Sequence, residues 1–122
     1  MQFSDSLEAN AFRSRGGEYA WLARDAPLAV DEITRTGVPL LGGDVWVVSG
    51  ATINPAPSTG GRPSVIGWTC DRRPDESLEG FVERSREESL AEIERMAAVP
   101  IDNVPEGGEI RFNLTWAKST TS

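Results

Sequence analysis

The chain has 122 residues, of which 39% are hydrophobic and 25% are charged, so it falls among globular domains and outside the disordered chains. Nineteen acidic residues against twelve basic ones give a net charge of −7, which disfavours direct nucleic-acid binding and favours a basic partner. A charge of this size also keeps a small domain soluble. No apolar run approaches the roughly 20 residues of a membrane span, so no membrane contact is expected.

The side chains on which most enzymes rely are scarce. The sequence has no histidine, which removes the commonest general base, the commonest metal ligand and every Ser-His or Cys-His pair. Its one cysteine, Cys70, cannot form an internal disulfide. Residues 1–8 lack a basic region followed by an apolar core, so the expected location is the cytoplasm. We expect recognition and not catalysis, with no cofactor and no metal.

The first third of the chain predicts a strand and then a helix. Residues 1–17 are weakly patterned and are expected to form a peripheral segment outside the domain. Residues 18–23 are a short apolar run with two aromatic side chains, typical of a strand, although their alanine and leucine content also suits a helix. Asp25 is the predicted N-cap of a helix that carries Pro27 in its first turn and ends at Gly37.

The middle of the chain predicts a hairpin with a long loop. The glycines and the aspartate of residues 42–44 are expected to form a turn or bulge before the strand Val-Trp-Val-Val at residues 45–48. Residues 49–64 are rich in Pro, Gly, Ser and Thr, which predicts a long mobile connection. A third strand follows at residues 65–70.

The last third of the chain gives the clearest periodicity. Residues 78–97 predict an amphipathic helix capped by Ser77. Its predicted inner face consists of Leu78, Phe81, Val82, Ser85, Ser89, Ile93, Met96 and Ala97. Residues 110–116 alternate between apolar and polar side chains, which predicts a strand with one buried face. Residues 118–122 are expected to fray.

This order of elements predicts an α+β fold in a single domain spanning residues 18–117. The βαββαβ sequence is that of a ferredoxin-like arrangement, with two helices on one face of a four-stranded antiparallel sheet. The other face of the sheet would stay open, and such a face is a candidate binding surface.

Several side chains are candidates for a binding site. Cys70 ends an apolar strand and is best interpreted as a small buried side chain, because no histidine is present to activate it. The carboxylates around the start of the second helix do not have the tight spacing of a calcium loop and instead match the helix dipole. They are also a patch suited to a basic partner. This acidic patch consists of Asp71, Asp75, Glu76 and Glu79.

The tryptophans give a second candidate surface. Trp46 and Trp68 lie on neighbouring predicted strands, and periodicity does not decide whether they face the core or the open side of the sheet. On the open side they would form an aromatic platform beside Asp44, of a kind enriched at protein interfaces. The predicted partner-binding set is therefore Asp44, Trp46, Trp68, Asp71, Asp75, Glu76 and Glu79.

Two blocks of the sequence resemble a known family. Residues 37–46, Gly-Val-Pro-Leu-Leu-Gly-Gly-Asp-Val-Trp, resemble the Gly-Ile-Pro-x-Leu-Gly-Gly-Asp-Val-Tyr signature of the immunity protein 40 family from bacterial polymorphic toxin systems. Residues 68–71, Trp-Thr-Cys-Asp, and the helix capped by Ser77 are similar to the second block of that family. The resemblance covers about residues 19–116. Trp46 in place of tyrosine, the long 49–64 connection and Pro27 depart from the pattern.

The resemblance implies a small cytoplasmic antitoxin that binds a cognate toxin domain and blocks its activity. It supplies no catalytic residue. The acidic surface suits a basic toxin such as a nuclease, whose substrate site must attract phosphate. Another class stays open: a small-ligand-binding or regulatory α+β module with a pocket lined by Trp46 and Trp68, or a homodimer through the sheet face. An enzyme would depend on Cys70 or carboxylates alone.

Overall fold

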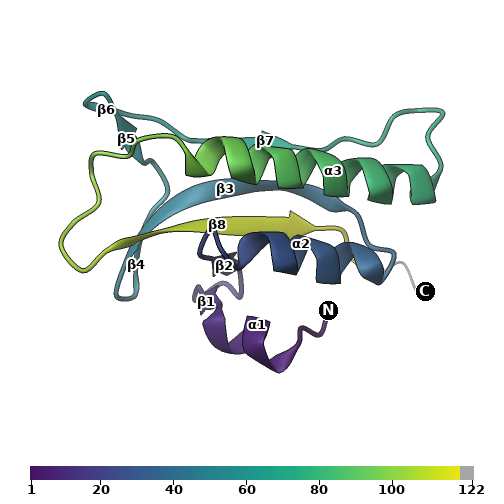
Figure 1. The fold of residues 1–122 in the computed structure, drawn as a ribbon, viewed down its shortest axis with the longest axis horizontal. Helices are drawn as coiled ribbons and strands as arrows, with labels where there is room; N and C mark the ends of the chain where they lie inside the picture. Colours follow the sequence, from purple (N-terminus) through teal and green to yellow (C-terminus); the bar gives the residue numbers. More distant parts are fainter. Residues whose placement is uncertain (119–122) are drawn as a thin grey trace.

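Two layers make up the molecule: an antiparallel sheet, and helices α2 and α3 packed side by side on one of its faces (Figure 1). The computed structural model describes residues 1–118. The helices are α1 (Asp5–Asn10), α2 (Ala26–Arg35) and α3 (Leu78–Ala97). The strands are β1 (Phe12–Arg13), β2 (Tyr19–Trp21), β3 (Leu40–Ser49), β4 (Thr52–Asn54), β5 (Ser58–Thr59), β6 (Arg62–Pro63), β7 (Gly67–Thr69) and β8 (Glu109–Trp116).

The two longest strands hold the centre of the sheet. β3 and β8 pair along almost their whole length, from Leu40 opposite Trp116 to Val48 opposite Glu109, with a register shift between Leu40 and Gly42. The sheet order is β1-β2-β8-β3-β4, and β7 also pairs with β3, on the edge that β4 occupies further along. An irregularity therefore lies next to Gly42 as expected, but residues 42–44 belong to β3 and do not precede it.

The α+β class and the single domain with an antiparallel sheet are confirmed, but the four-stranded ferredoxin-like arrangement is not. The main sheet has six strands, and its centre is made by the second and fourth predicted strands, β3 and β8. A ferredoxin-like sheet places the first and third strands at its centre. Here those strands, β2 and β7, are only three residues long and lie outside the central pair.

The helix α3 has the predicted bounds. Ser77 is its N-cap, and the Ser77 Oγ accepts a hydrogen bond of 3.0 Å from the Gly80 N–H. Its buried residues are Phe81, Ser85, Ser89, Ile93 and Met96. Of the predicted face, Val82 is only partly buried, and Leu78 and Ala97 are exposed. The helix α2 ends before Gly37, whose φ of 83° is the left-handed conformation that glycine adopts readily.

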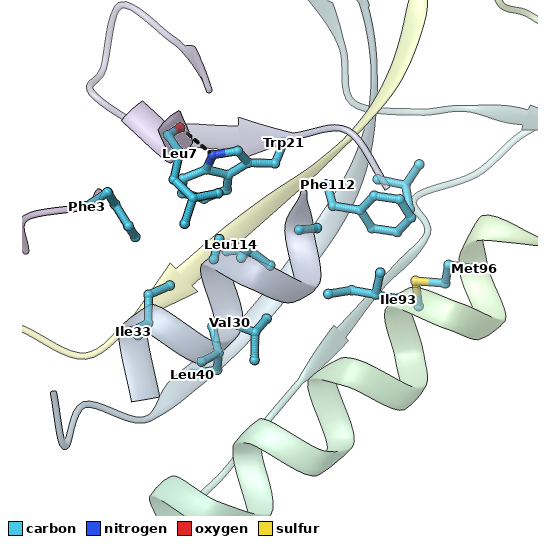
Figure 2. Close-up of a cluster of buried hydrophobic side chains, with 13 residues drawn as sticks. Phe3, Leu7, Trp21, Val30, Ile33, Leu40, Ile93, Met96, Phe112 and Leu114 are labelled. Carbon is cyan, nitrogen blue, oxygen red and sulfur yellow. Dashed lines mark hydrogen bonds between the residues drawn. The ribbon is translucent and has the colours of Figure 1, made fainter. Parts of the chain in front are cut away.

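The N-terminal segment is not peripheral. Phe3 and Leu7 are buried in the main hydrophobic core, where Figure 2 shows them beside Trp21 and across from Ile93 and Met96 of α3. The indole N–H of Trp21 donates a 2.9 Å hydrogen bond to the Leu7 carbonyl. β1 then pairs with β2 and adds a strand to the sheet. Residues 1–17 therefore complete the domain.

The connection at residues 49–64 is also more regular than its composition predicts. It contains β4, which forms a hairpin with β3, and the separate β5–β6 hairpin. Asp102 accepts a 2.7 Å hydrogen bond from the Gly61 N–H, and Asn103 accepts one of 2.8 Å from the Ser58 N–H. Hydrogen bonds from Ser58 and Gly61 hold the pKa of Asp102 below its usual value. These side chains fix the connection to the segment after α3.

At the C-terminus, residues 119–122 of the segment expected to fray lie outside the described part of the chain. None of the helices within residues 1–118 is long and apolar enough to cross a membrane.

Candidate partner-binding site

The seven residues predicted from the sequence lie in three places. Asp44 and Trp46 project from the sheet face that carries no helices, since they alternate with Val45 of the main core. Trp68 projects from the opposite face, toward α3. Asp71, Asp75, Glu76 and Glu79 lie together where the chain enters α3. The seven predicted residues therefore do not form one continuous surface.

The two tryptophans do not form an aromatic platform. Trp46 is only 6% exposed and packs with Ala20 and Val48 in a small cluster on the helix-free face. The ring of Trp68 lies over Gly43, where a Cβ would overlap it. The indole N–H of Trp68 donates a 3.0 Å hydrogen bond to Ser89 Oγ of α3. The glycine and the serine therefore hold Trp68 between strand and helix.

Asp44 is a half-buried carboxylate on the helix-free face. Burial, and secondarily the negative charge of Glu18, raise the pKa of Asp44 above its ordinary value. Its neighbours in register are Gly67 and Asn113. A Cβ at Gly67 would overlap Asp44 Oδ1, so glycine leaves room for the carboxylate. The side-chain amide of Asn113 donates a 2.9 Å hydrogen bond to the Tyr19 carbonyl and not to Asp44.

Within the acidic patch, Glu76 has a structural partner. Arg84 donates to both carboxylate oxygens of Glu76 at 2.7 Å, to Glu88 at 2.8 Å and to the Asp71 carbonyl at 2.6 Å. The hydrogen bonds from Arg84 lower the pKa of Glu76 to about 2. Glu76 therefore braces the entry to α3, while Asp71, Asp75 and Glu79 are exposed.

Sequence reasoning missed a hollow beside this patch. It has a volume of about 350 Å³ and lies where α2 ends and α3 begins, lined mainly by residues 36–39, Leu41, Leu78 and Phe81, with Arg72 and Lys118 at its side. Leu41 is 38% exposed and Leu78 is 42% exposed. The adjoining leucines Leu40 and Leu41 were a usable signal, because only one of two neighbours on a strand can face the core.

Two further hollows continue the first across the same end of the molecule. One shares Val38 and Ala117 with it and adds Met1 and Trp116. The other shares Gly37 and Leu78 and adds Glu79 and Glu83. We call these three hollows together the end groove. Its apolar floor, exposed leucines and mixed charges suit the side chains of another protein.

The arrangement offers little for catalysis or metal binding. Burial raises the pKa of the Cys70 thiol, so the thiolate is disfavoured. Across residues 1–118, no group of three or more side chains has the composition and closeness of a metal site. Neither Trp46 nor Trp68 lines the hollows of the end groove.

Comparison with known families adds the remaining observation. The model of the family described as immunity protein 40 matches residues 6–104, which is most of the chain. The chain belongs to the immunity protein 40 family. Membership indicates a toxin-neutralising role through binding of a cognate toxin, in a family that is generally non-enzymatic. No curated protein and no solved structure matches the chain.

The immunity protein 40 resemblance is carried by two blocks, and both reach the end groove. Residues 37–39 and Leu41 come from the first block, and Phe81 comes from the helix of the second. Part of the first block also has a structural reason, because Gly42 and Gly43 allow β7 and Trp68 to approach β3 closely. The blocks thus build the fold at the same end of the molecule that carries the groove.

Proposed function

We propose that this immunity protein neutralises a basic toxin domain in the cytoplasm by binding it through the end groove and the neighbouring exposed carboxylates. The observation that carries the proposal is the concentration of exposed apolar side chains in the groove. Of the five large hydrophobic residues that are exposed within residues 1–118, Met1, Leu41 and Leu78 line it. Membership of a toxin-neutralising family supports the same conclusion.

The charge around the groove supports a basic partner. Glu79 and Glu83 line the groove, and Asp75 precedes α3, whose first residue Leu78 also lines it. All three carboxylates are exposed, and within residues 1–118 none of them is in an ion pair with another side chain. Unpaired surface carboxylates attract a basic protein and speed its approach, while the apolar floor supplies the lasting contact. A nuclease domain is a toxin of this kind, since it must attract phosphate.

The direct test starts with capture of the partner from native cells with the affinity-tagged chain, at low and at high salt, followed by mass spectrometry. The captured protein is then expressed alone and together with this chain. The expected result is growth arrest when the partner is expressed alone and restored growth on co-expression. A stoichiometric partner that is harmless when expressed alone would overturn the proposal.

The location of the interface is tested with a matched pair of leucines. Leu78→Asp places a charge in the end groove, whereas Leu28→Asp places the same charge at another exposed leucine, on α2 and outside the groove. Because a buried interface leucine contributes about 2 kcal/mol, Leu78→Asp is expected to weaken toxin binding by roughly thirtyfold. Leu28→Asp is expected to change Kd by less than about twofold. Titration calorimetry measures both, and equal losses would exclude the groove.

A further inference from the structure

The outer edge of β7 carries a row of free backbone groups. The Val45 N–H donates to the Ile66 carbonyl at 2.8 Å, and the Cys70 N–H donates to the Leu41 carbonyl at 2.9 Å. In an antiparallel pair such residues alternate, so residues 66, 68 and 70 direct their backbone toward β3. Val65, Gly67 and Thr69 direct their N–H and C=O groups outward, and within residues 1–118 these groups make no hydrogen bond.

This edge lacks the side chains that usually block strand pairing, namely charges and prolines. β7 itself is only three residues long, but hydrogen bonds of Ile66 and Cys70 extend its pairing with β3 to residues 66–70. The edge strand β1 has two residues and carries Arg13, and β4 is followed directly by Pro55. Residues 64–70, Ser-Val-Ile-Gly-Trp-Thr-Cys, contain neither a charge nor a proline, and Val65 is 72% exposed. Figure 1 shows β7 at the margin of the sheet, behind α3.

The net charge of −7 favours a strand from a basic protein over a second copy at this edge. β7 lies against α3, since Trp68 and Cys70 both contact Ser89. The helix α3 carries six glutamates against three arginines. If the β7 edges of two copies paired, the two negative α3 helices would lie on the same side of a continuous sheet and repel each other. A strand from a basic protein meets attraction there instead.

We propose that a strand of the cognate toxin adds to the outer edge of β7, with its basic side chains on the face that carries α3. The toxin then forms backbone hydrogen bonds with Val65, Gly67 and Thr69, and the sheet continues from one protein into the other. This inference rests on the proposed function, because it assigns a second contact to the same toxin. The end groove and the β7 edge both adjoin the segment that leads from β7 into α3.

Hydrogen exchange tests the edge directly, with the toxin domain purified from the capture experiment as the probe. The amides of Gly67 and Thr69 are expected to exchange fast in the isolated chain and at least about tenfold more slowly in the complex. The amides of Trp68 and Cys70 face β3 and serve as internal references. A tight complex in which Gly67 and Thr69 exchange as fast as in the isolated chain overturns the inference and leaves toxin binding intact.

A pair of threonines separates edge docking from docking on the sheet face. Thr69 and Thr115 are both exposed and are both register partners of Gly42, but Thr69 lies on the edge strand and Thr115 on the central strand β8. Thr69→Lys is expected to weaken toxin binding by about tenfold, because a lysine blocks the edge and repels a basic strand. Thr115→Lys is expected to have an effect below about twofold.

Three further outcomes overturn the edge inference. Equal losses from both threonine variants indicate docking on the face, and no loss from Thr69→Lys excludes the edge. Slow exchange of Gly67 and Thr69 in the isolated chain, with a doubled mass in sedimentation equilibrium, identifies a second copy as the occupant. Thermal unfolding of each variant checks that the chain remains folded. If the captured partner is not toxic, the proposed function fails, and that result is distinct from all three.

Discussion

Arg84 joins helix α3 to the segment that precedes it, in which its partners Asp71 and Glu76 lie. Its guanidinium holds the Glu76 carboxylate, the Glu88 carboxylate and the Asp71 carbonyl at distances between 2.6 and 2.8 Å. The positions of the exposed carboxylates Asp71 and Asp75 depend on this brace, because they belong to the segment that it secures. A residue that is not expected to touch the partner thereby sets the geometry of residues that do.

Arg84→Met keeps the apolar stem of the side chain and removes its charge. The variant is expected to have a Tm lower by a few degrees at neutral pH, measured by circular dichroism, since it loses all of these hydrogen bonds. Arg86→Met is the control, because Arg86 makes a single ion pair with Asp31 and neither side chain is deeply buried. A control variant that is destabilised as much as Arg84→Met would contradict the bracing role.

The same contact gives a pH dependence with a definite sign. The pKa of Glu76 is about 2 in the folded chain against an ordinary value of 4.5, so ionised Glu76 favours the folded state. This contribution is fully present above pH 4.5 and is lost as the pH falls from there toward 2. In Arg84→Met the loss of Tm across this range is expected to be smaller than in the wild-type chain. An unchanged slope would show that other carboxylates account for the acid sensitivity.

At the scale of elements, the N-terminal segment and α3 show what sequence patterns reveal and what they miss. The bounds of α3 and the course of β8 follow from periodicity over many residues, and both are confirmed. Phe3 and Leu7 are only two buried residues on a segment too short for a period to show. Their burial depends on Tyr19, Trp21 and Trp116, which are distant in sequence.

Strand order and the binding surface could not be predicted from the sequence, because both depend on contacts between residues that are distant in the chain. The length of β8 was predictable, whereas the prediction for β3 covers only residues 45–48 of Leu40–Ser49. Which strands pair depends on how the two helical crossovers pack. The exposed carboxylates of the acidic patch were predictable, whereas the ion pair of Glu76 with Arg84 depends on the path of the loop. Leu78 fits the helical period of the core and is nevertheless exposed, because it lies at the first turn, where the end groove opens.

Phe3→Ala tests the structural role of the N-terminal segment. The Phe3 ring lies within 5.5 Å, between ring centroids, of Tyr19, Trp21 and Trp116. Its removal leaves a cavity and is expected to lower the free energy of unfolding by about 3 kcal/mol in urea titrations followed by tryptophan fluorescence. Met1→Ala is the control, since Met1 is 49% exposed and is expected to change stability by less than about 0.5 kcal/mol. A stability unchanged by Phe3→Ala would contradict the placement of this segment in the core.

At the scale of the whole molecule, the net charge of −7 governs how the chain meets its partner. Fixed charges act over about one Debye length, roughly 10 Å at 0.1 M salt, and therefore mainly affect the approach of the two proteins. The apolar groove and the strand edge act only after contact. Association and dissociation should consequently respond differently to salt.

Stopped-flow association at rising salt checks this separation. Between about 0.05 and 0.5 M NaCl the association rate constant for the toxin is expected to fall by about tenfold, while the dissociation rate constant changes by less than about threefold. Sodium sulfate at matched ionic strength provides the control for ion-specific effects. An association rate that is indifferent to salt would count against a basic toxin.

The placement of Met1 and Lys118 has a practical consequence for handling the protein. Both residues line the end groove, so a purification tag or fluorescent fusion attached next to either of them would crowd the surface that we propose to bind the toxin. The β3–β4 turn at Gly50 and Ala51 is exposed, has open space around Gly50 and lies at the opposite end of the molecule (Figure 1). A tag inserted in this turn leaves both the groove and the β7 edge accessible, and it orients the chain with its binding end outward on a sensor surface.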